Sequence, residues 1–199
     1  MHKRLLGATS AVAFLLLTAC SETPKAEAKV ETPTATAEPM SAKKAYWEMY
    51  KLVFKWAKDA EPLSMAAKTI PEIKFADGKA GEWSAIFVSR SLKEARTLTY
   101  ATVGEHKGSA ISGGQPWYGS SAKSKPFMSS VFQVDSDAAF KTAATKASDW
   151  LKKNPNEKVE MYLGSENRFA NPVWYVIWGD PKKSGYVAFV DATTGLAVN

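Results

Sequence analysis

Cysteine and histidine are the residues that the chain has least of. Of its 199 residues, one is cysteine and two are histidine. A single cysteine cannot form a disulfide within the chain, so a disulfide-stapled fold is excluded. Zinc sites built on several cysteines are excluded as well, and a site built on histidine has only His2 and His106 to draw on. We therefore expect no bound metal and no cofactor.

The sequence also lacks the short motifs that mark common catalytic sites. It contains no Gly-x-Ser-x-Gly elbow, no phosphate-binding P-loop, no dinucleotide fingerprint and no His-Glu-x-x-His. We interpret His106, which stands between glycines, as a surface-loop residue. Asp135 and Asp137 bracket Ser136 ahead of a helical pattern, and helix capping explains them more simply than acid–base chemistry or calcium binding. We expect a protein that is not an enzyme.

The chain has a moderate excess of basic residues. It carries 26 Lys and Arg against 20 Asp and Glu, a net charge of +6. Without its first 19 residues it loses Lys3 and Arg4 and keeps +4. A charge this weak and dispersed does not indicate nucleic-acid binding, although mild attraction to anionic lipid or cell-wall polymer is compatible with it.

Residues 1–19 have the pattern of a secretory signal peptide. A basic start is followed by an almost wholly apolar run over residues 5–17, which is too short to span a bilayer, since a spanning helix needs about 20 residues. No later run approaches that length. The small-residue site reads Leu17-Thr18-Ala19-Cys20. The alternative interpretation is an ordinary signal followed by an incidental cysteine.

The four residues ending in Cys20 resemble a bacterial lipobox. The resemblance implies that Cys20 carries three acyl chains and becomes the first residue of the mature protein. Several acyl chains together give stable anchoring. Ser21 follows the cysteine, and the lipoprotein rule then implies the outer membrane, since an aspartate there marks retention at the inner one. We expect a lipid-anchored envelope protein that faces the periplasm.

Residues 20–44 have the composition of a disordered tether. The segment is rich in Ala, Thr, Glu, Lys and Pro and contains no aromatic residue. It cannot bury enough apolar surface to offset chain entropy. A flexible coil of this length spans about 27 Å, so the folded part can stand off the membrane.

Residues 45–199 are expected to form a globular α+β region, with halves at 45–128 and 129–199. Helical periodicity occurs twice, over residues 46–57, with Pro62 as the stop, and over residues 140–151. Strand-like runs follow each helix, and they are residues 70–76, 83–89 and 95–103, then 158–163, 173–178, 185–191 and 196–198. We expect two principal helices packed on antiparallel sheet, either as a duplicated unit or as two unrelated halves.

The last strands carry the residues of a family resemblance. The runs 172–177 and 185–196 give an aromatic strand, a turn, a strand ending in Asp191, and then Thr194-Gly195. Physically, Asp191 is expected to accept backbone N–H groups in the turn, and Gly195 to adopt a positive φ.

These runs resemble the end of a PepSY domain, with the likeness covering residues 137–199. The resemblance implies a PepSY- or cystatin-like helix-plus-meander unit. PepSY domains occur in propeptides of thermolysin-type metallopeptidases and in bacterial envelope proteins, and peptidase inhibition or partner binding is proposed for them. The first half departs from the pattern, because residues 97–103 lack the Asp-x-x-Thr-Gly ending.

Residues 104–127 form a glycine- and serine-rich segment that contains Trp117 and Tyr118. Long loops in compact domains are often functional, and an exposed Trp-Tyr pair anchors in partner pockets or stacks on sugars. The alternative is that Trp117 plugs the core between the halves. Trp178 shares a strand face with Trp174, so either a helix or a partner covers that face.

We therefore take Trp117, Tyr118 and Trp178 as candidate binding residues. The hypothesis is a non-catalytic module that binds an envelope protein or peptide, with a peptidase-inhibitory or regulatory role as one form of it. A binder of peptidoglycan or other carbohydrate is the alternative.

Overall fold

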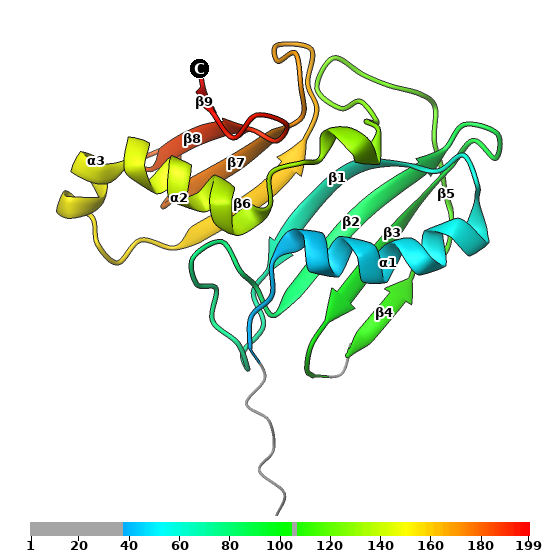
Figure 1. Ribbon diagram of the computed structural model, residues 1–199, viewed down its shortest axis with the longest axis horizontal. Coiled ribbons are helices and arrows are strands. Elements are labelled where there is room, and N and C mark those ends of the chain that lie inside the picture. The colour runs from blue at the N-terminus through cyan, green and yellow to red at the C-terminus, as the bar shows by residue number, and fades with distance from the viewer. Residues whose placement is uncertain (1–37, 105–106) are drawn as a thin grey trace, which may run out of the picture. The chain divides into compact units, whose positions relative to one another are not determined.

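The computed structural model describes residues 38–104 and 107–199 (Figure 1). The predicted signal peptide, Cys20, most of the tether and His106 lie outside the described residues. The described residues form one compact unit. Across the described ranges, no helix is both long enough and apolar enough to cross a membrane.

The elements follow one another as a helix and a set of strands, twice. The first set is α1 (Ala42–Trp56), β1 (Glu61–Lys68), β2 (Glu82–Ser89), β3 (Glu94–Ala101), β4 (Gly108–Ile111) and β5 (Gln115–Pro116). A short 3-10 turn, η1 (Ser129–Val131), leads to the second set, which is α2 (Ser136–Lys146), α3 (Ser148–Lys153), β6 (Val159–Gly164), β7 (Val173–Trp178), β8 (Tyr186–Asp191) and β9 (Ala197–Val198).

The nine strands of the described residues belong to one antiparallel sheet. Its order is β4-β3-β2-β1-β6-β7-β8-β9, and β5 pairs with β3. Each half is thus a meander, and the first full strands of the two meanders, β1 and β6, pair at the centre (Figure 1). The α+β class and the antiparallel sheet are confirmed. The junction within the sheet is short, because β1 and β6 pair through Ser64–Gly164, Met65–Leu163 and Ala66–Tyr162.

The helices cover one face of the sheet, and the main core lies between the helices and that face. α1 packs on β2, β3 and β4, whereas α2 packs on β7 and β8. Trp83 of β2 and Trp174 of β7 are fully buried and meet edge to face, with ring centroids 6.1 Å apart. Each indole N–H donates to a backbone carbonyl ahead of a helix, Trp83 to Met40 and Trp174 to Val134, both at 2.9 Å. The two tryptophans therefore tie the chain segment before each helix to the sheet.

The N-termini of α1 and α2 meet each other. The Asp135 carboxylate accepts the Lys43 N–H of α1 at 2.9 Å and the Ser136 N–H of α2 at 2.7 Å. The buried Ser136 hydroxyl accepts the Ala42 N–H of α1 at 2.9 Å. Free N–H groups at helix starts need such acceptors, and a carboxylate also suits the positive end of the helix dipole. The predicted capping by Asp135 is confirmed, and it serves both helices.

The opposite face of the sheet carries a smaller aromatic cluster. Phe169 and Tyr175 pack there with Tyr162 and Phe189. Tyr162 and Tyr175 stack with ring centroids 4.1 Å apart, and the Arg168 guanidinium lies 4.4 Å from the Phe169 ring. Burial raises the pKa of Tyr162 to about 12 and also raises that of Tyr175. The loop after β6 thus covers part of this second face.

The first strand does not lie where the sequence pattern placed it. Residues 70–76 form a loop, and the strand is Glu61–Lys68, with Pro62 inside it and not at the end of α1. A register shift between Pro62 and Ser64 breaks the alternation of apolar side chains in β1. The strand-like pattern of residues 70–76 has another cause. Ile73 is buried, and the Phe75 ring packs edge-on against Phe140 of α2.

Two further boundaries differ from those expected. The second helix is divided at Ala147 into α2 and α3, and Trp150 of α3 packs against Tyr186, with ring centroids 5.9 Å apart. The fold also includes residues before 45. Met40 is buried and exchanges two backbone hydrogen bonds with Ala80, at 2.9 and 3.0 Å, before α1 begins at Ala42.

Candidate functional site

Trp117 and Tyr118 lie beside the turn that joins β2 to β3. β5 pairs with the start of β3, at Glu94 and Ala95. The Trp117 N–H then donates to the Lys93 carbonyl at 2.9 Å. These backbone bonds fix the Trp-Tyr pair against the turn, so the two side chains are presented from a strand end and not from a free loop.

The β2–β3 turn is itself held by one carboxylate. Asp59 accepts the Ser91 N–H at 2.8 Å and the hydroxyls of Ser89 and Ser91 at 2.7 and 3.0 Å. These hydrogen bonds, that from the Ser91 backbone first, hold the pKa of Asp59 below its ordinary value. The carboxylate is therefore charged at neutral pH and links the turn to Asp59 through three hydrogen bonds.

Aromatic and basic side chains share the surface of this turn. Tyr118 is 95% exposed. The Arg90 guanidinium lies 5.7 Å from the Trp117 ring centroid and also pairs with Glu61 at 3.0 Å. Arg90, Lys93, Trp117 and Tyr118 line a shallow pocket of about 340 Å³ together with Gly119. We call these four side chains the aromatic–basic patch.

The structure separates the three aromatic residues that the sequence offered as binding candidates. Trp117 and Tyr118 come together in the patch, and Trp117 is not among the side chains of the main core, so it is no plug between the halves. Trp178 is only 2% exposed and packs against Phe140 of α2 and Tyr186 of β8. This corrects our expectation for Trp178, because a helix covers its strand face and no partner can reach it.

Arg90 and Lys93 were missed as site residues by sequence reasoning. They lie more than twenty residues before Trp117, in a turn that no motif marks. Leu92, 51% exposed, stands in the same turn and was missed as well. A basic turn after a predicted strand was the available signal, but only the pairing of β5 with β3 brings it beside the Trp-Tyr pair.

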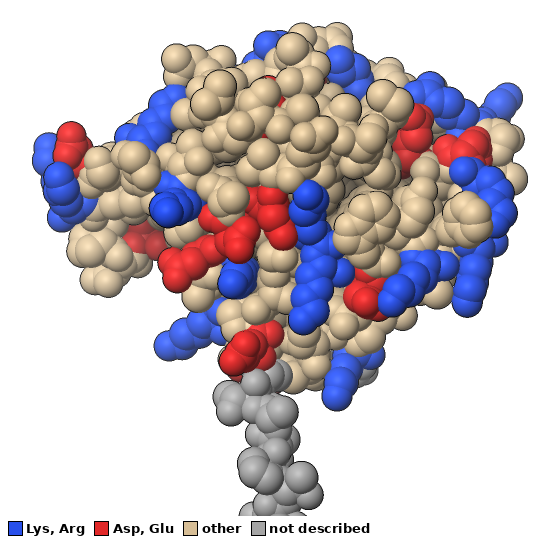
Figure 2. All heavy atoms as spheres, in the orientation of Figure 1, with Lys and Arg blue, Asp and Glu red and all other residues tan. Residues whose placement is uncertain are grey.

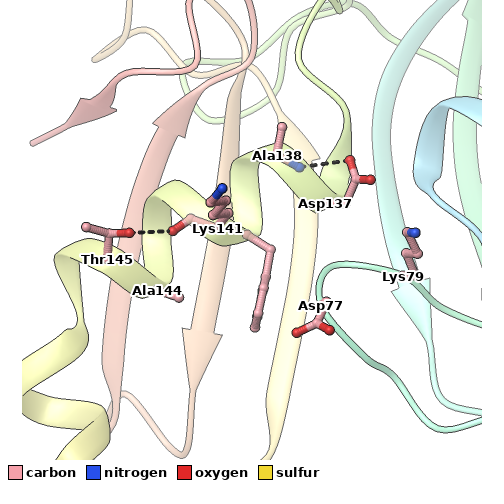
Figure 3. A pocket seen from close by; sticks show the side chains of 8 residues that line it. Asp77, Lys79, Asp137, Ala138, Lys141, Ala144 and Thr145 are labelled. Atoms are coloured by element: carbon pink, nitrogen blue, oxygen red, sulfur yellow. Dashed lines mark hydrogen bonds between the residues drawn. The ribbon is translucent and has the colours of Figure 1, made fainter.

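A second, larger concavity lies along α2 and has about 740 Å³ of space (Figure 3). Asp77 and Lys79 come from the β1–β2 loop, while Asp137, Lys141 and Thr145 come from the helix. Figure 3 shows the Asp137 carboxylate turned to its own helix, where it accepts the Ala138 N–H at 2.8 Å.

This groove does not have the character of a catalytic site. Its charged side chains are exposed or half-exposed, and none is buried where it would orient a small ligand. Thr145 is engaged within the helix as well, since its hydroxyl donates to the Lys141 carbonyl at 2.9 Å (Figure 3). Within residues 38–104 and 107–199, no group of three or more His, Cys, Asp or Glu side chains is placed to hold a metal ion.

Comparison with known proteins gives no relative for this chain. No family model matches it, and neither the curated proteins nor the solved structures contain a match.

Proposed function

We propose that the protein is a non-catalytic binding module of the bacterial cell envelope, which uses the aromatic–basic patch to bind an envelope protein or peptide. The observation that carries the proposal is the 95% exposed Tyr118, fixed beside Trp117, Arg90 and Lys93. Tyr, Trp and Arg are the residues that most often dominate binding energy at protein interfaces.

The chemistry of the patch favours a partner segment with an apolar pocket and acidic rim. Tyr118 is free to insert its ring, and Arg90 and Lys93 place two cations beside it. The anchored turn lowers the entropy that binding must remove, because Asp59 and β5 already hold the backbone.

A protein partner fits the patch better than a sugar. A carbohydrate platform needs an open aromatic face, and the Arg90 guanidinium lies over the Trp117 ring. Of the two aromatic rings in the patch, that of Tyr118 then remains fully open for stacking. Binding of peptidoglycan is the second candidate, and the aromatic pair is the observation in its favour.

We also propose that Cys20 is the lipid anchor, which places the module at the outer membrane and facing the periplasm. Support comes from the sequence Leu17-Thr18-Ala19-Cys20 behind a basic, apolar leader. Incorporation of labelled palmitate that is lost in Cys20→Ser tests this step. Labelling that persists in the variant, or is absent from both chains, would refute it.

A PepSY-like character of residues 137–199 belongs to the same proposal. Its support is local, because the Asp191 carboxylate accepts the N–H groups of Thr193 and Thr194, and Gly195 has a φ of +77°. The peptidase-inhibitory form of the hypothesis makes a defined prediction. The purified protein should slow a thermolysin-type peptidase in stoichiometric amounts, and unchanged peptidase activity at saturating protein would exclude it.

The binding proposal is tested with a photo-crosslinking amino acid at position 118 of the full-length chain in living cells. The expected product is one dominant protein adduct whose crosslinked segment is acidic. Arg90→Glu and Trp117→Ala should each weaken binding of that segment by about thirtyfold, the size of a hot-spot contact. Leu196→Ala, which removes another exposed apolar side chain (67% exposed), is the matched control and should change nothing.

Two results would contradict the proposal. Crosslinks that survive Arg90→Glu and Trp117→Ala would show that the patch does not carry binding. Retention of the purified chain on isolated cell-wall sacculi, lost in Tyr118→Ala, would favour the carbohydrate candidate.

A further inference from the structure

Helix α1 leaves two large aromatic side chains in solvent on the side turned away from the sheet. Trp47 and Phe54 are each 52% exposed, while Tyr46, Met49 and Val53 are buried. Positions seven residues apart differ by only about 20° around a helix. Trp47 and Phe54 therefore lie on one line along the outer surface of α1.

Exposed lysine side chains accompany these two rings. Lys44, Lys51 and Lys55 are exposed on the same helix, and Lys58 follows it, with its Nζ 3.3 Å from the Phe54 ring centroid. We call these four lysines, with Trp47 and Phe54, the α1 outer face. Basic side chains lie along α1, whereas acidic ones gather near the start of α2 (Figure 2).

Acidic residues offset only part of this charge. Glu48 is the one carboxylate in the sequence of α1, and it pairs with Lys51 at 2.6 Å. The exposed part of the helix thus combines two aromatic rings with a net positive charge. Aromatic rings at headgroup depth, flanked by lysines whose apolar stems lie on the bilayer and whose ammonium groups reach the phosphates, are typical of interfacial helices.

We propose that the α1 outer face lies on an anionic phospholipid surface. Charge complementarity argues for this occupant, because the four lysines outnumber the two nearby carboxylates, Glu48, which pairs with Lys51, and Asp59, which is held by hydrogen bonds to the β2–β3 turn. The shape of the face agrees, since Trp47 and Phe54 stand on a helix ridge, which inserts into a fluid surface without needing a matching pocket.

The length of chain before α1 brings this face within reach of a bilayer. Between Cys20 and Ala42 there are 21 residues. If this segment is the tether that its composition predicts, a coil of that length reaches about 25 Å. This step rests on the proposed lipid anchor, whereas the charge and aromatic arguments do not. With the anchor present, a local concentration in the millimolar range makes even weak docking effective.

The test uses the chain from residue 21 onward, without lipid, so that the anchor contributes nothing. The core of the described region lies entirely within Thr36–Asn199, and circular dichroism verifies that the chain is folded. The protein is sedimented with vesicles of phosphatidylglycerol and phosphatidylethanolamine, and separately with phosphatidylcholine alone. We expect binding to the anionic vesicles only, weakening as salt is raised.

Paired charge variants locate the binding face. Lys51→Glu with Lys55→Glu should lower partitioning at least about twentyfold, since each lysine near an anionic surface contributes about fivefold. Lys152→Glu with Lys153→Glu makes the same change in net charge on α3 and should lower it by less than about threefold. Equal losses in the two pairs would overturn the proposal, because net charge alone would then explain binding.

The aromatic part of the face is tested by fluorescence quenching from brominated lipids. Bound protein should be quenched, and Trp47→Phe should lose most of that quenching while still sedimenting with vesicles. Trp47→Ser with Phe54→Ser should lower partitioning, whereas Leu196→Ser should not.

Three results would refute lipid docking without bearing on the binding proposal for the aromatic–basic patch. They are absence of binding to anionic vesicles, equal binding to phosphatidylcholine, and a concentration-dependent dimer that Trp47→Ser disrupts. The last would make a second copy the occupant of the face.

Discussion

Removal of the Asp135 carboxylate is expected to destabilise both helices at once. In the structure this carboxylate accepts the Ser136 N–H at the start of α2 and the Lys43 N–H of α1, over 90 residues away in sequence. Loss of one N-cap costs about 1 kcal/mol, and the partly buried Lys43 N–H would be left without an acceptor. For Asp135→Ala we expect a loss of about 2–3 kcal/mol in the free energy of unfolding.

The loss divides into a hydrogen-bond part and a charge part. Asp135→Asn keeps an acceptor oxygen but removes the negative charge that faces two helix dipoles, and should cost about 1 kcal/mol. Urea unfolding followed by circular dichroism measures both variants. In a thermal melt, Asp135→Ala should lower Tm by about 5–10 °C.

Asp137→Ala is the matched control for this experiment. The Asp137 carboxylate accepts only the exposed Ala138 N–H of its own helix, so its removal should cost about 0.5 kcal/mol. If Asp135→Ala and Asp137→Ala lose the same stability, Asp135 caps no second helix and the reasoning fails.

Other perturbations test separate parts of the fold. Trp83→Phe removes one of the two donors to the Met40 carbonyl and leaves a space in the main core, so it should lower the free energy of unfolding by about 2 kcal/mol in urea; an unchanged midpoint would contradict this. Gly78→Ala should cost about 2 kcal/mol or more, since φ is +77° and a Cβ would lie 2.8 Å from the Asp137 Cα of α2 and closer still to the Ser136 carbonyl oxygen, whereas Gly113→Ala meets no atom within 4 Å and should be neutral. Stability should fall as pH rises from about 10 toward 12, because the unfolded chain releases its phenolic protons first while burial raises the pKa of Tyr162 to about 12; an ultraviolet titration that shows Tyr162 ionising near 10 would refute this.

The parts of the fold that local periodicity determines could be predicted from the sequence. Tyr46, Met49 and Val53 recur at helical spacing and are buried in α1. In the last meander, β7 was predicted residue for residue, and the roles of Asp191 and Gly195 in the final turn are confirmed. These features depend on neighbours in sequence, and therefore leave a local pattern.

Features that depend on distant parts of the chain could not be predicted. The bulge at Pro62 hides the alternation of β1, and the pairing of β1 with β6 leaves no signal in either strand alone. The shared capping by Asp135 needs the two helix starts to meet. The same holds for the candidate site, where composition pointed to Trp117 and Tyr118 but only the sheet brings Arg90 beside them.

The hydrogen bonds that hold Met40 have a mechanical consequence. The chain enters the fold at this residue, which exchanges two backbone hydrogen bonds with Ala80 and accepts the indole N–H of Trp83. Tension applied along the preceding chain therefore loads these three bonds together before it can unwind α1. A partner pulling on the folded part would transmit its force directly to the central strands, so traction would leave the helix and the surfaces it presents in place.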